Sequence, residues 1–351
     1  MLKTNWTDTT DKFDRFWGRE KGLKLIVADV SVKAPSYRDT ADYADYEQNL
    51  TKHLEFFAPK SFHGEAFPDL APYIGPGSLA TLIGSEPVYS EATIWFTEST
   101  MTLQEIKETC DRLIPIQADS AGHEYRWYKW AIDSARYYKN NSNGVFRASM
   151  PDFEQNLDIL SAVMGPQRLL MELLDNPSGV RKTMDSLYLV WEKVFDEVTG
   201  IIMEEGYTAY THYNLLGRGT TSVLQSDISC MLSEDMFDEF ELPYLRMQAE
   251  KLDNVIYHLD GPGAVRHLDS LLGIENINTI QWVPGAGAPG NADEMYHAMY
   301  ERIIDAGKGL YVFLNPEEIP GFIKRFPGCR ALIRTRVGNE EEQLRLIKEF
   351  T

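Results

Sequence analysis

Short apolar runs rich in β-branched residues recur along the chain, and stretches with helical periodicity separate most of them. A strand that is buried on both faces has this appearance in a sequence. Eight segments fit the description. The predicted strands span residues 24–30, 144–149, 207–214, 223–229, 255–260, 279–283, 310–314 and 331–335.

Amphipathic segments lie between these runs and are predicted helices. They span residues 153–164, 177–205, 233–252 and 291–306. Ser233 is a predicted N-cap, because Glu234 and Asp235 follow it in the first turn, where the helix dipole favours anions. Gly307 follows the last of these helices, at the position where a C-terminal glycine is expected.

Alternation of strands and helices predicts a parallel sheet, and eight such units predict a (β/α)8 TIM barrel of the α/β class. Residues 31–143 are too long for one crossover and contain the loop-like sequence PDLAPYIGPG. We therefore expect a single barrel domain over residues 1–351, in which residues 31–143 form an insertion or cap after the first strand.

Polar residues at the carboxyl ends of barrel strands are the expected site of function. The candidates are Asp152, Asn214, Asp227, His258, Asp260, Gln281, Trp282 and Asn315. His258 and Asp260 are two apart on one strand, so their side chains point to the same face. Such a pair is either a set of metal ligands, an acid–base couple, or a structural pair in which Asp260 caps the following turn. Asp227 lies on the preceding predicted strand, and consecutive strands bring it close to His258.

Composition and charge exclude several classes of function and location. The chain has 351 residues, with 34 Lys and Arg against 53 Asp and Glu, and a net charge of −19. Such a surface repels nucleic acid and anionic membranes. No apolar run approaches the roughly 18 residues that a membrane span needs. The N-terminus is polar, and the three cysteines are far apart without a CxxC pair. We therefore expect a cytoplasmic protein without disulfides.

Residues 257–272, YHLDGPGAVRHLDSLL, followed by IQWVPGAG, resemble the uroporphyrinogen decarboxylase superfamily. Three further segments share this resemblance, which covers most of the chain from about Gly64 onward. They are GEAFPDLAPYIGPGSLATLIG, VFRASMPDFEQNLDILSAVMG and QSDISCMLSEDMFDEFELPYL. The resemblance implies a (β/α)8 barrel with a pocket at the carboxyl ends of its strands.

The superfamily contains two chemistries. Its decarboxylases use no cofactor and hold a tetrapyrrole carrying many carboxylates with an N-terminal arginine cluster. The segment FWGREKGLKLIVADV lacks paired arginines, and a net charge of −19 does not attract a polyanion. Its thiol methyltransferases hold zinc with a His-x-Cys pair and a later Cys. This chain has His258-Leu259-Asp260 instead, and no Cys in residues 313–315.

A ligand set of His258, Asp260 and Asp227 has nitrogen and oxygen donors, which are harder ligands than thiolates. Zinc accepts such donors as well. The resemblance therefore implies a methyltransferase that moves a methyl group between a small methylated compound and a corrinoid carried by a partner protein. Zinc would act as a Lewis acid. The expected substrate contacts are Asp152, Asn214, Gln281, Trp282 and Asn315.

Two alternatives stay open. One is a cofactor-free decarboxylase of a carboxylated, porphyrinogen-like ring, in which Asp260 or Asp227 stabilises a protonated intermediate and His258 moves the proton. The other is a barrel that binds a small molecule or a corrinoid without turning it over.

Overall fold

In the computed structural model, which describes residues 2–90 and 93–350, six parallel strands form the larger of two main sheets. In spatial order they are β1 (Lys24–Val30), β12 (Ala331–Val337), β11 (Gly309–Phe313), β10 (Thr279–Val283), β9 (Asn254–Asp260) and β8 (Thr221–Gln225). Most positions on these strands are buried. Burial of both faces explains why the strands are almost continuous apolar runs in the sequence.

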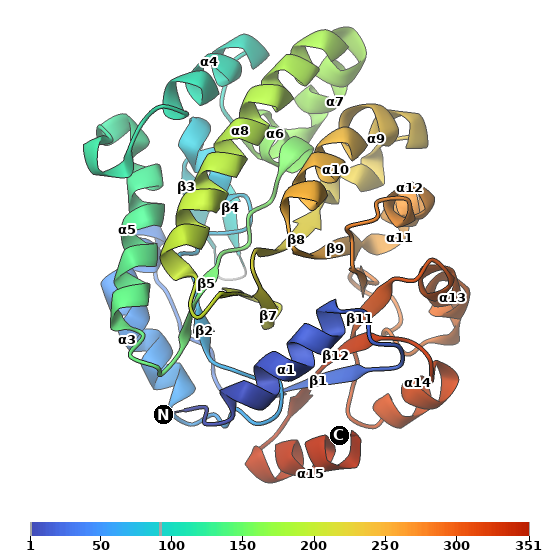
Figure 1. Ribbon diagram of the computed structural model, residues 1–351. Helices are drawn as coiled ribbons and strands as arrows, with labels where there is room; N and C mark the ends of the chain where they lie inside the picture. Colours follow the sequence, from blue (N-terminus) through green and yellow to red (C-terminus); the bar gives the residue numbers. More distant parts are fainter. Residues whose placement is uncertain (1, 91–92, 351) are drawn as a thin grey trace.

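A second sheet of four strands lies beside the first, on the other side of the centre of the molecule (Figure 1). It comprises β2 (Asp69–Leu70), β5 (Arg147–Met150), β6 (Tyr207–Tyr210) and β7 (Leu215–Arg218). The first three strands are parallel, and β7 returns antiparallel to β6. Both β6 and β7 lie beside β8, but over residues 2–90 and 93–350 no strand pairing joins the two sheets. The structure therefore shows an α/β protein with a large parallel sheet, and the closed eight-stranded barrel that we predicted is not established.

Helices surround the strands on the outside (Figure 1). They are α1 (Trp6–Trp17), α2 (Thr40–Ala44), α3 (Tyr46–Phe57), α4 (Leu103–Leu113), α5 (Arg126–Asn141), α6 (Asn156–Met164), α7 (Pro166–Asp175), α8 (Pro177–Ile202), α9 (Glu234–Phe240), α10 (Leu242–Lys251), α11 (Gly261–Ala264), α12 (Leu268–Leu272), α13 (His297–Asp305), α14 (Ile319–Arg325) and α15 (Glu340–Phe350). None of the helices in the described part of the chain is long and apolar enough to cross a membrane.

All eight predicted strands are present, and two of them end earlier than expected for a local reason. The third stops at Tyr210 because residues 211–214 form a turn, in which His212 and Asn214 have positive φ angles of 62° and 52°. The fourth stops at Gln225, since residues Asp227–Met231 form a 3₁₀ helix, η4. The predicted N-cap is confirmed, because the Ser233 side chain accepts a hydrogen bond from the Met236 amide at 3.2 Å.

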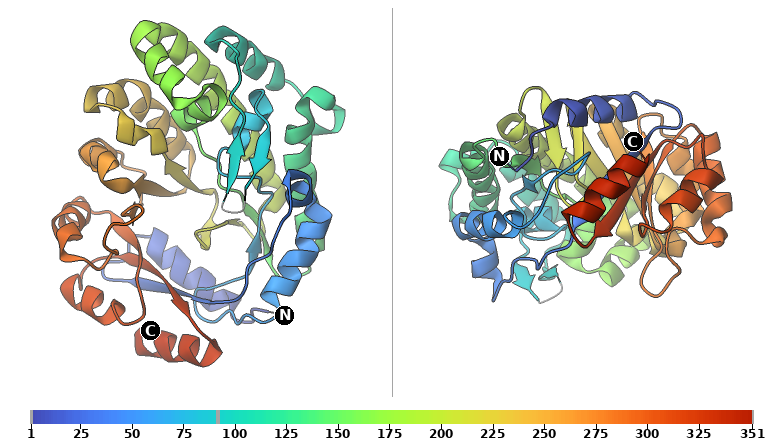
Figure 2. Two further views of the ribbon diagram at one scale, coloured as in Figure 1. Left: turned by 180° about the vertical axis from the view of Figure 1, so that it is seen from behind. Right: turned by 90° about the horizontal axis from the view of Figure 1, so that it is seen from below.

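Residues 31–143 contribute more than a cap. They contain helices α2 to α5, strand β2, and an antiparallel hairpin of β3 (Pro87–Tyr89) and β4 (Ile94–Phe96). Strand β2 pairs in parallel with β5 and so belongs to the four-stranded sheet. The hairpin lies toward the end of the strands opposite to α1 (Figure 2). The division into one domain with an insertion stays a prediction.

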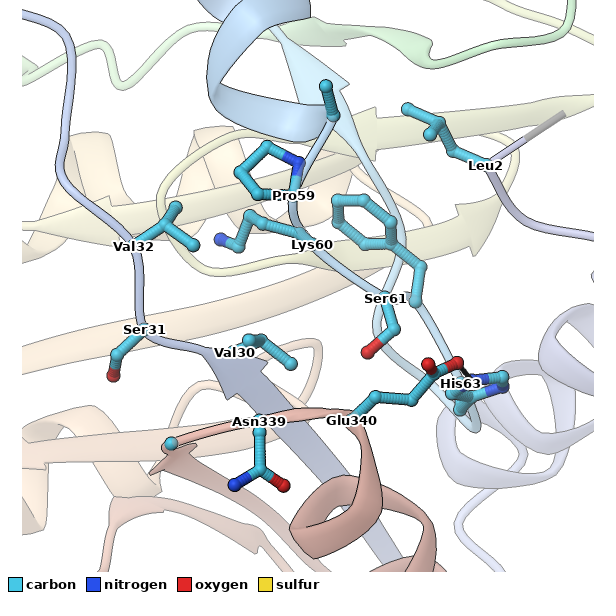
Figure 3. Close-up of a pocket in the computed structure, with 13 residues that line it drawn as sticks. Leu2, Val30, Ser31, Val32, Pro59, Lys60, Ser61, His63, Asn339 and Glu340 are labelled. Carbon is cyan, nitrogen blue, oxygen red and sulfur yellow. Dashed lines mark hydrogen bonds and ion pairs between the residues drawn. The ribbon is translucent and has the colours of Figure 1, made fainter.

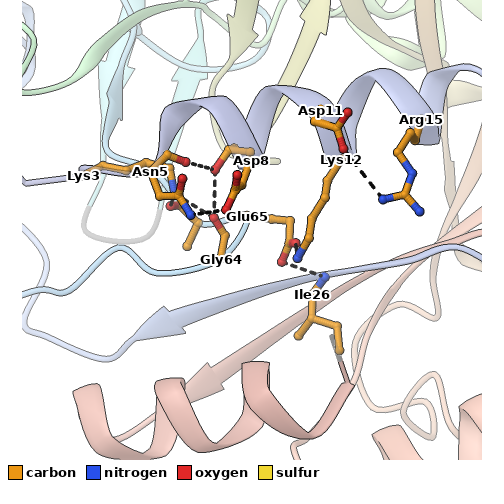
Figure 4. Close-up of polar contacts among 11 residues, drawn as sticks. Lys3, Asn5, Asp8, Asp11, Lys12, Arg15, Ile26, Gly64 and Glu65 are labelled. Carbon is orange, nitrogen blue, oxygen red and sulfur yellow. Dashed lines mark hydrogen bonds and ion pairs between the residues drawn. The ribbon is translucent and has the colours of Figure 1, made fainter.

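The end of the molecule near α1 is held by buried charges (Figure 4). The Lys3 ammonium donates to the Gly64 and Ala66 carbonyls at 2.7 and 2.9 Å. The fully buried Glu65 pairs with Lys12 of α1 and accepts from the amide of Ile26 in β1 at 3.4 Å. A buried carboxylate of this kind needs such partners, so these contacts tie α1 to the start of the sheet.

Candidate functional site

Three side chains in register across neighbouring strands form the base of the site. Gln225 of β8 pairs with His258 of β9, and His258 pairs with Gln281 of β10. Partners in a parallel register point to the same face. Asp260 lies two residues beyond His258 at the end of β9, and Asp227 begins η4 just after β8. The carboxyl ends of three strands thus present one cluster of polar groups.

Asp227, His258 and Asp260 come together as a potential ligand set. One ligand atom of each residue lies within 4.8 Å of the others. Asp227 is exposed, and His258 and Asp260 are half-buried, so the cluster is open to solvent. Ligands about 2.0–2.2 Å from a tetrahedral zinc ion stand roughly 3.3–3.6 Å apart. The observed separations exceed that by no more than about 1.5 Å, and the donor types fit zinc.

Gln281 fixes the orientation of the histidine ring. The His258 Nδ1 and the Gln281 Oε1 are 2.6 Å apart. When Nδ1–H donates to this oxygen, the lone pair of the imidazole is on Nε2, the tautomer that ligates a metal through Nε2. On the other side, the Oε1 atom of Gln225 is buried and has no hydrogen-bond partner among the described residues. It is therefore free to accept from a ligand N–H or O–H.

A group of buried carboxylates lies next to this cluster, in the segment from the end of β5 into α6. Asp158 accepts from the amides of Asp227 and Ile228 at 2.8 and 2.9 Å, which holds the start of η4 in place. Burial, together with the nearby Asp227 carboxylate, raises the pKa of Asp158 to about 8. Asp158 thus positions Asp227 from α6.

Asp152 and Glu154 precede α6. Asp152 accepts from the Tyr210 hydroxyl at 2.9 Å, and burial raises its pKa to about 6, although that hydrogen bond and His258 act in the opposite direction. Burial also raises the pKa of Glu154 well above its usual value. Sequence analysis singled out Asp152 but missed Glu154 and Asp158. Acidic residues at the start of a helix directly after a strand were the available signal.

The other sequence candidates lie apart from the cluster. Asn214 donates to the Phe67 carbonyl at 2.8 Å and accepts from the Phe67 amide at 3.2 Å, so it clamps the chain. Trp282 is 2% exposed and packs against Tyr296. It follows Gln281 on β10, so it points to the opposite face of the strand and is not brought to the site.

Asn315 lines a pocket of about 470 Å³ together with Asp260. It is exposed, and its backbone N–H donates to the Glu318 carboxylate at 2.7 Å. The pocket adjoins the metal-ligand candidates, because Asp260 belongs to both. Asn315 therefore lies near the candidate site, in the pocket that it shares with Asp260, but it is not part of the cluster around His258.

Sequence analysis also missed an ion pair on the same inner face of the sheet, between the end of β1 and the middle of β12. The Arg334 Nε atom is 2.7 Å from the Asp29 carboxylate, and the guanidinium also donates to the His212 carbonyl. Charged residues inside two predicted strands were the available signal, since a charge in a buried strand needs a partner or a role.

A pocket of about 480 Å³ opens beside this pair, between the segment after α3 and the start of α15 (Figure 3). Its lining includes Lys60, Ser61, His63, Asn339 and Glu340. The His63 Nε2 and Glu340 Oε1 atoms are 2.7 Å apart. Burial lowers the pKa of Lys60.

Comparison with known proteins supports the fold. No model of a known protein family matches the sequence, and no curated protein matches it either. Among solved structures, the chain is similar to a methyltransferase from Methanosarcina mazei. The superposition covers 98% of both chains with a TM-score of 0.62 at 8% sequence identity. At this identity the likeness establishes a shared fold over nearly the whole chain and nothing finer.

Proposed function

We propose that the protein is a metal-dependent methyltransferase that moves a methyl group between a small methylated compound and a corrinoid bound to a partner protein. The observation that carries this proposal is the convergence of Asp227, His258 and Asp260 within 4.8 Å at the ends of β8 and β9. Similarity in fold to an archaeal methyltransferase supports it. Zinc is the proposed metal, because the nitrogen and oxygen donors fit it.

The protein's own residues perform the positioning. His258 offers Nε2 because Gln281 takes up the Nδ1–H. Asp227 is held by the two amide bonds that anchor η4 on Asp158. When bound, zinc supplies Lewis acidity toward the heteroatom that carries or accepts the methyl group. A preorganised set of three ligands leaves room for that heteroatom at the open, solvent-facing side of the cluster.

Metal analysis and mutation test the proposal. Protein purified without chelator should contain zinc, and competition with a chromophoric chelator should give its affinity. His258→Ala should abolish binding, whereas His123→Ala, which removes an exposed histidine outside the cluster, should leave it unchanged. Transfer is then assayed by the absorbance change when cob(I)alamin becomes methylcobalamin, over a panel of methyl donors. Absence of zinc from the wild type, or equal affinity in both variants, rejects the metal-dependent mechanism.

A second candidate is cofactor-free decarboxylation of a carboxylated ring. The same convergence of His258 with two carboxylates suits proton transfer to a ring carbon. The Arg334 guanidinium, fixed by Asp29, offers a partner for a substrate carboxylate. Conversion of uroporphyrinogen to coproporphyrinogen in the presence of chelator would favour this candidate. Tight binding of a ligand without any turnover would favour a non-catalytic barrel.

A further inference from the structure

A cavity of about 520 Å³ lies between the β3–β4 hairpin and the start of α6, and its lining combines aromatic rings with carboxylates. Trp95 and Phe96 of β4 form part of one side. The charged residues in the lining are all acidic, and the described part of the chain contributes no Lys, Arg or His to it. They are Glu98, Glu154, Asp158 and Asp227. A volume of this size suits a small organic ligand.

Glu154 is an uncompensated carboxylate in this cavity. Within residues 2–90 and 93–350, no donor bonds to its carboxylate and no cation pairs with it. The charges that act on it are those of Asp158, Asp227 and Asp152, which are all negative. Glu154 is half-buried. An ionised carboxylate at such a position is costly without a partner, and a positively charged ligand would supply the missing compensation.

The aromatic side of the cavity lies close to this carboxylate. A Cβ atom placed on Gly77 would be 2.9 Å from the Phe96 ring and 3.1 Å from the Glu154 Oε2. The ring edge and the carboxylate are therefore no more than about 6 Å apart. Trp95 also lines the cavity and is 66% exposed. Aromatic faces next to a carboxylate attract organic ammonium ions, because the ring quadrupole and the charge act together.

We propose that this cavity binds an organic ammonium ion carrying N-methyl groups, with its charge at Glu154 and its methyl groups against Trp95 and Phe96. Asp227 lines the cavity and also belongs to the candidate metal cluster. The bound cation therefore lies beside that cluster and is the methylated substrate; this last step rests on the proposed function, whereas the binding does not. A bare metal ion is the less suitable occupant, since it gains nothing from the aromatic wall.

Calorimetric titration of the full chain tests the binding in buffer with chelator and without corrinoid. Choline is the cationic probe, and 3,3-dimethylbutan-1-ol is its neutral counterpart of the same shape. Choline should bind at least about tenfold more tightly than the alcohol. Glu154→Gln, which removes the charge and keeps the shape, should weaken choline binding about tenfold or more. Glu55→Gln makes the same change in net charge at an exposed position outside the cavity and should have no effect.

Two further variants test the aromatic side. Trp95→Leu should weaken choline binding about fivefold through loss of the cation–π contact. Gly77→Ala inserts a methyl group between the Phe96 ring and Glu154 without backbone strain, since φ of Gly77 is −75°, and it should weaken binding of both probes. Each variant is compared only after thermal unfolding shows it folded, so Glu154→Gln and Gly77→Ala report independently if Trp95→Leu unfolds.

Three results would overturn the proposal. The first is that choline and the neutral alcohol bind equally, or that neither binds detectably. The second is that Glu154→Gln and Glu55→Gln have the same affinity for choline. The third, measured without chelator, is that Glu154→Gln abolishes zinc binding but leaves choline binding unchanged. Choline binding without methyl transfer to cob(I)alamin would reject the proposed function and leave the ammonium site intact. Zinc-dependent methyl transfer from other donors, without choline binding, would support the proposed function and reject the ammonium site.

Discussion

Replacing Asp152 by Asn should change the pH dependence of stability in a defined direction. Asp152 is 8% exposed, and burial raises its pKa from 3.8 to about 6. The native protein therefore retains this proton at pH values where the unfolded chain has lost it. Stability falls as the pH rises from about 4 to 6 and stays reduced above that. The shift of about two units corresponds to about 3 kcal/mol.

Asn at this position keeps the shape and an acceptor oxygen for the Tyr210 hydroxyl, which lies 2.9 Å from Asp152 Oδ1. The free energy of unfolding of Asp152→Asn, measured relative to that of wild type, should thus increase by about 3 kcal/mol between pH 4 and pH 7.5, which means that the variant becomes the more stable protein. Urea denaturation in chelator-containing buffer across this range measures it. Asp305→Asn, at an exposed site, should show no such pH dependence. A constant difference, or one that moves the other way, would refute the reasoning.

Substitutions at three further positions have expected outcomes. Gln281→Leu leaves the His258 Nδ1–H without its acceptor and should weaken zinc binding about 10–100-fold in chelator competition, so an unchanged affinity would contradict the proposed tautomer. Asn214→Ala removes both bonds to the Phe67 backbone and should lower the free energy of unfolding by about 2–3 kcal/mol in urea; a change within about 0.5 kcal/mol would show that the clamp carries no weight. Ser233→Ala removes the N-cap of α9 and should cost about 1 kcal/mol by calorimetry, whereas Ser233→Asp should retain the cap.

The parallel strands could be predicted from the sequence because each is buried on both faces and is therefore a compact apolar run. The shared face of His258 and Asp260 followed from the two-residue period of a strand. Asp227 was predicted on strand 223–229 and near them by strand order; the proximity is confirmed, but the strand ends at Gln225 and Asp227 lies in η4. Local regularity and connectivity were sufficient for these features.

Other features depend on contacts between distant residues, which no local pattern carries. Strand β2 has two residues, and its pairing with β5 defines it. Asp158 was taken as part of a helix, yet its carboxylate bonds to amides 69 and 70 positions further along the chain. Trp282 is different, since alternation with Gln281 along one strand already placed it on the outer face. A substrate contact by Trp282 was therefore inconsistent with the pattern itself.

The pairing of β1 with β12 joins the two ends of the chain, since Lys24 to Val30 lie in register with Ala331 to Val337. Their separation of about 300 residues corresponds to about 15–60 s of translation at usual ribosomal rates. Throughout that time the first strand has no strand partner, because among the described residues β1 pairs with β12 alone, and an unpaired apolar strand is the kind of surface that chaperones bind. Nascent chains arrested at increasing lengths should therefore become resistant to protease only after Val337 has left the exit tunnel.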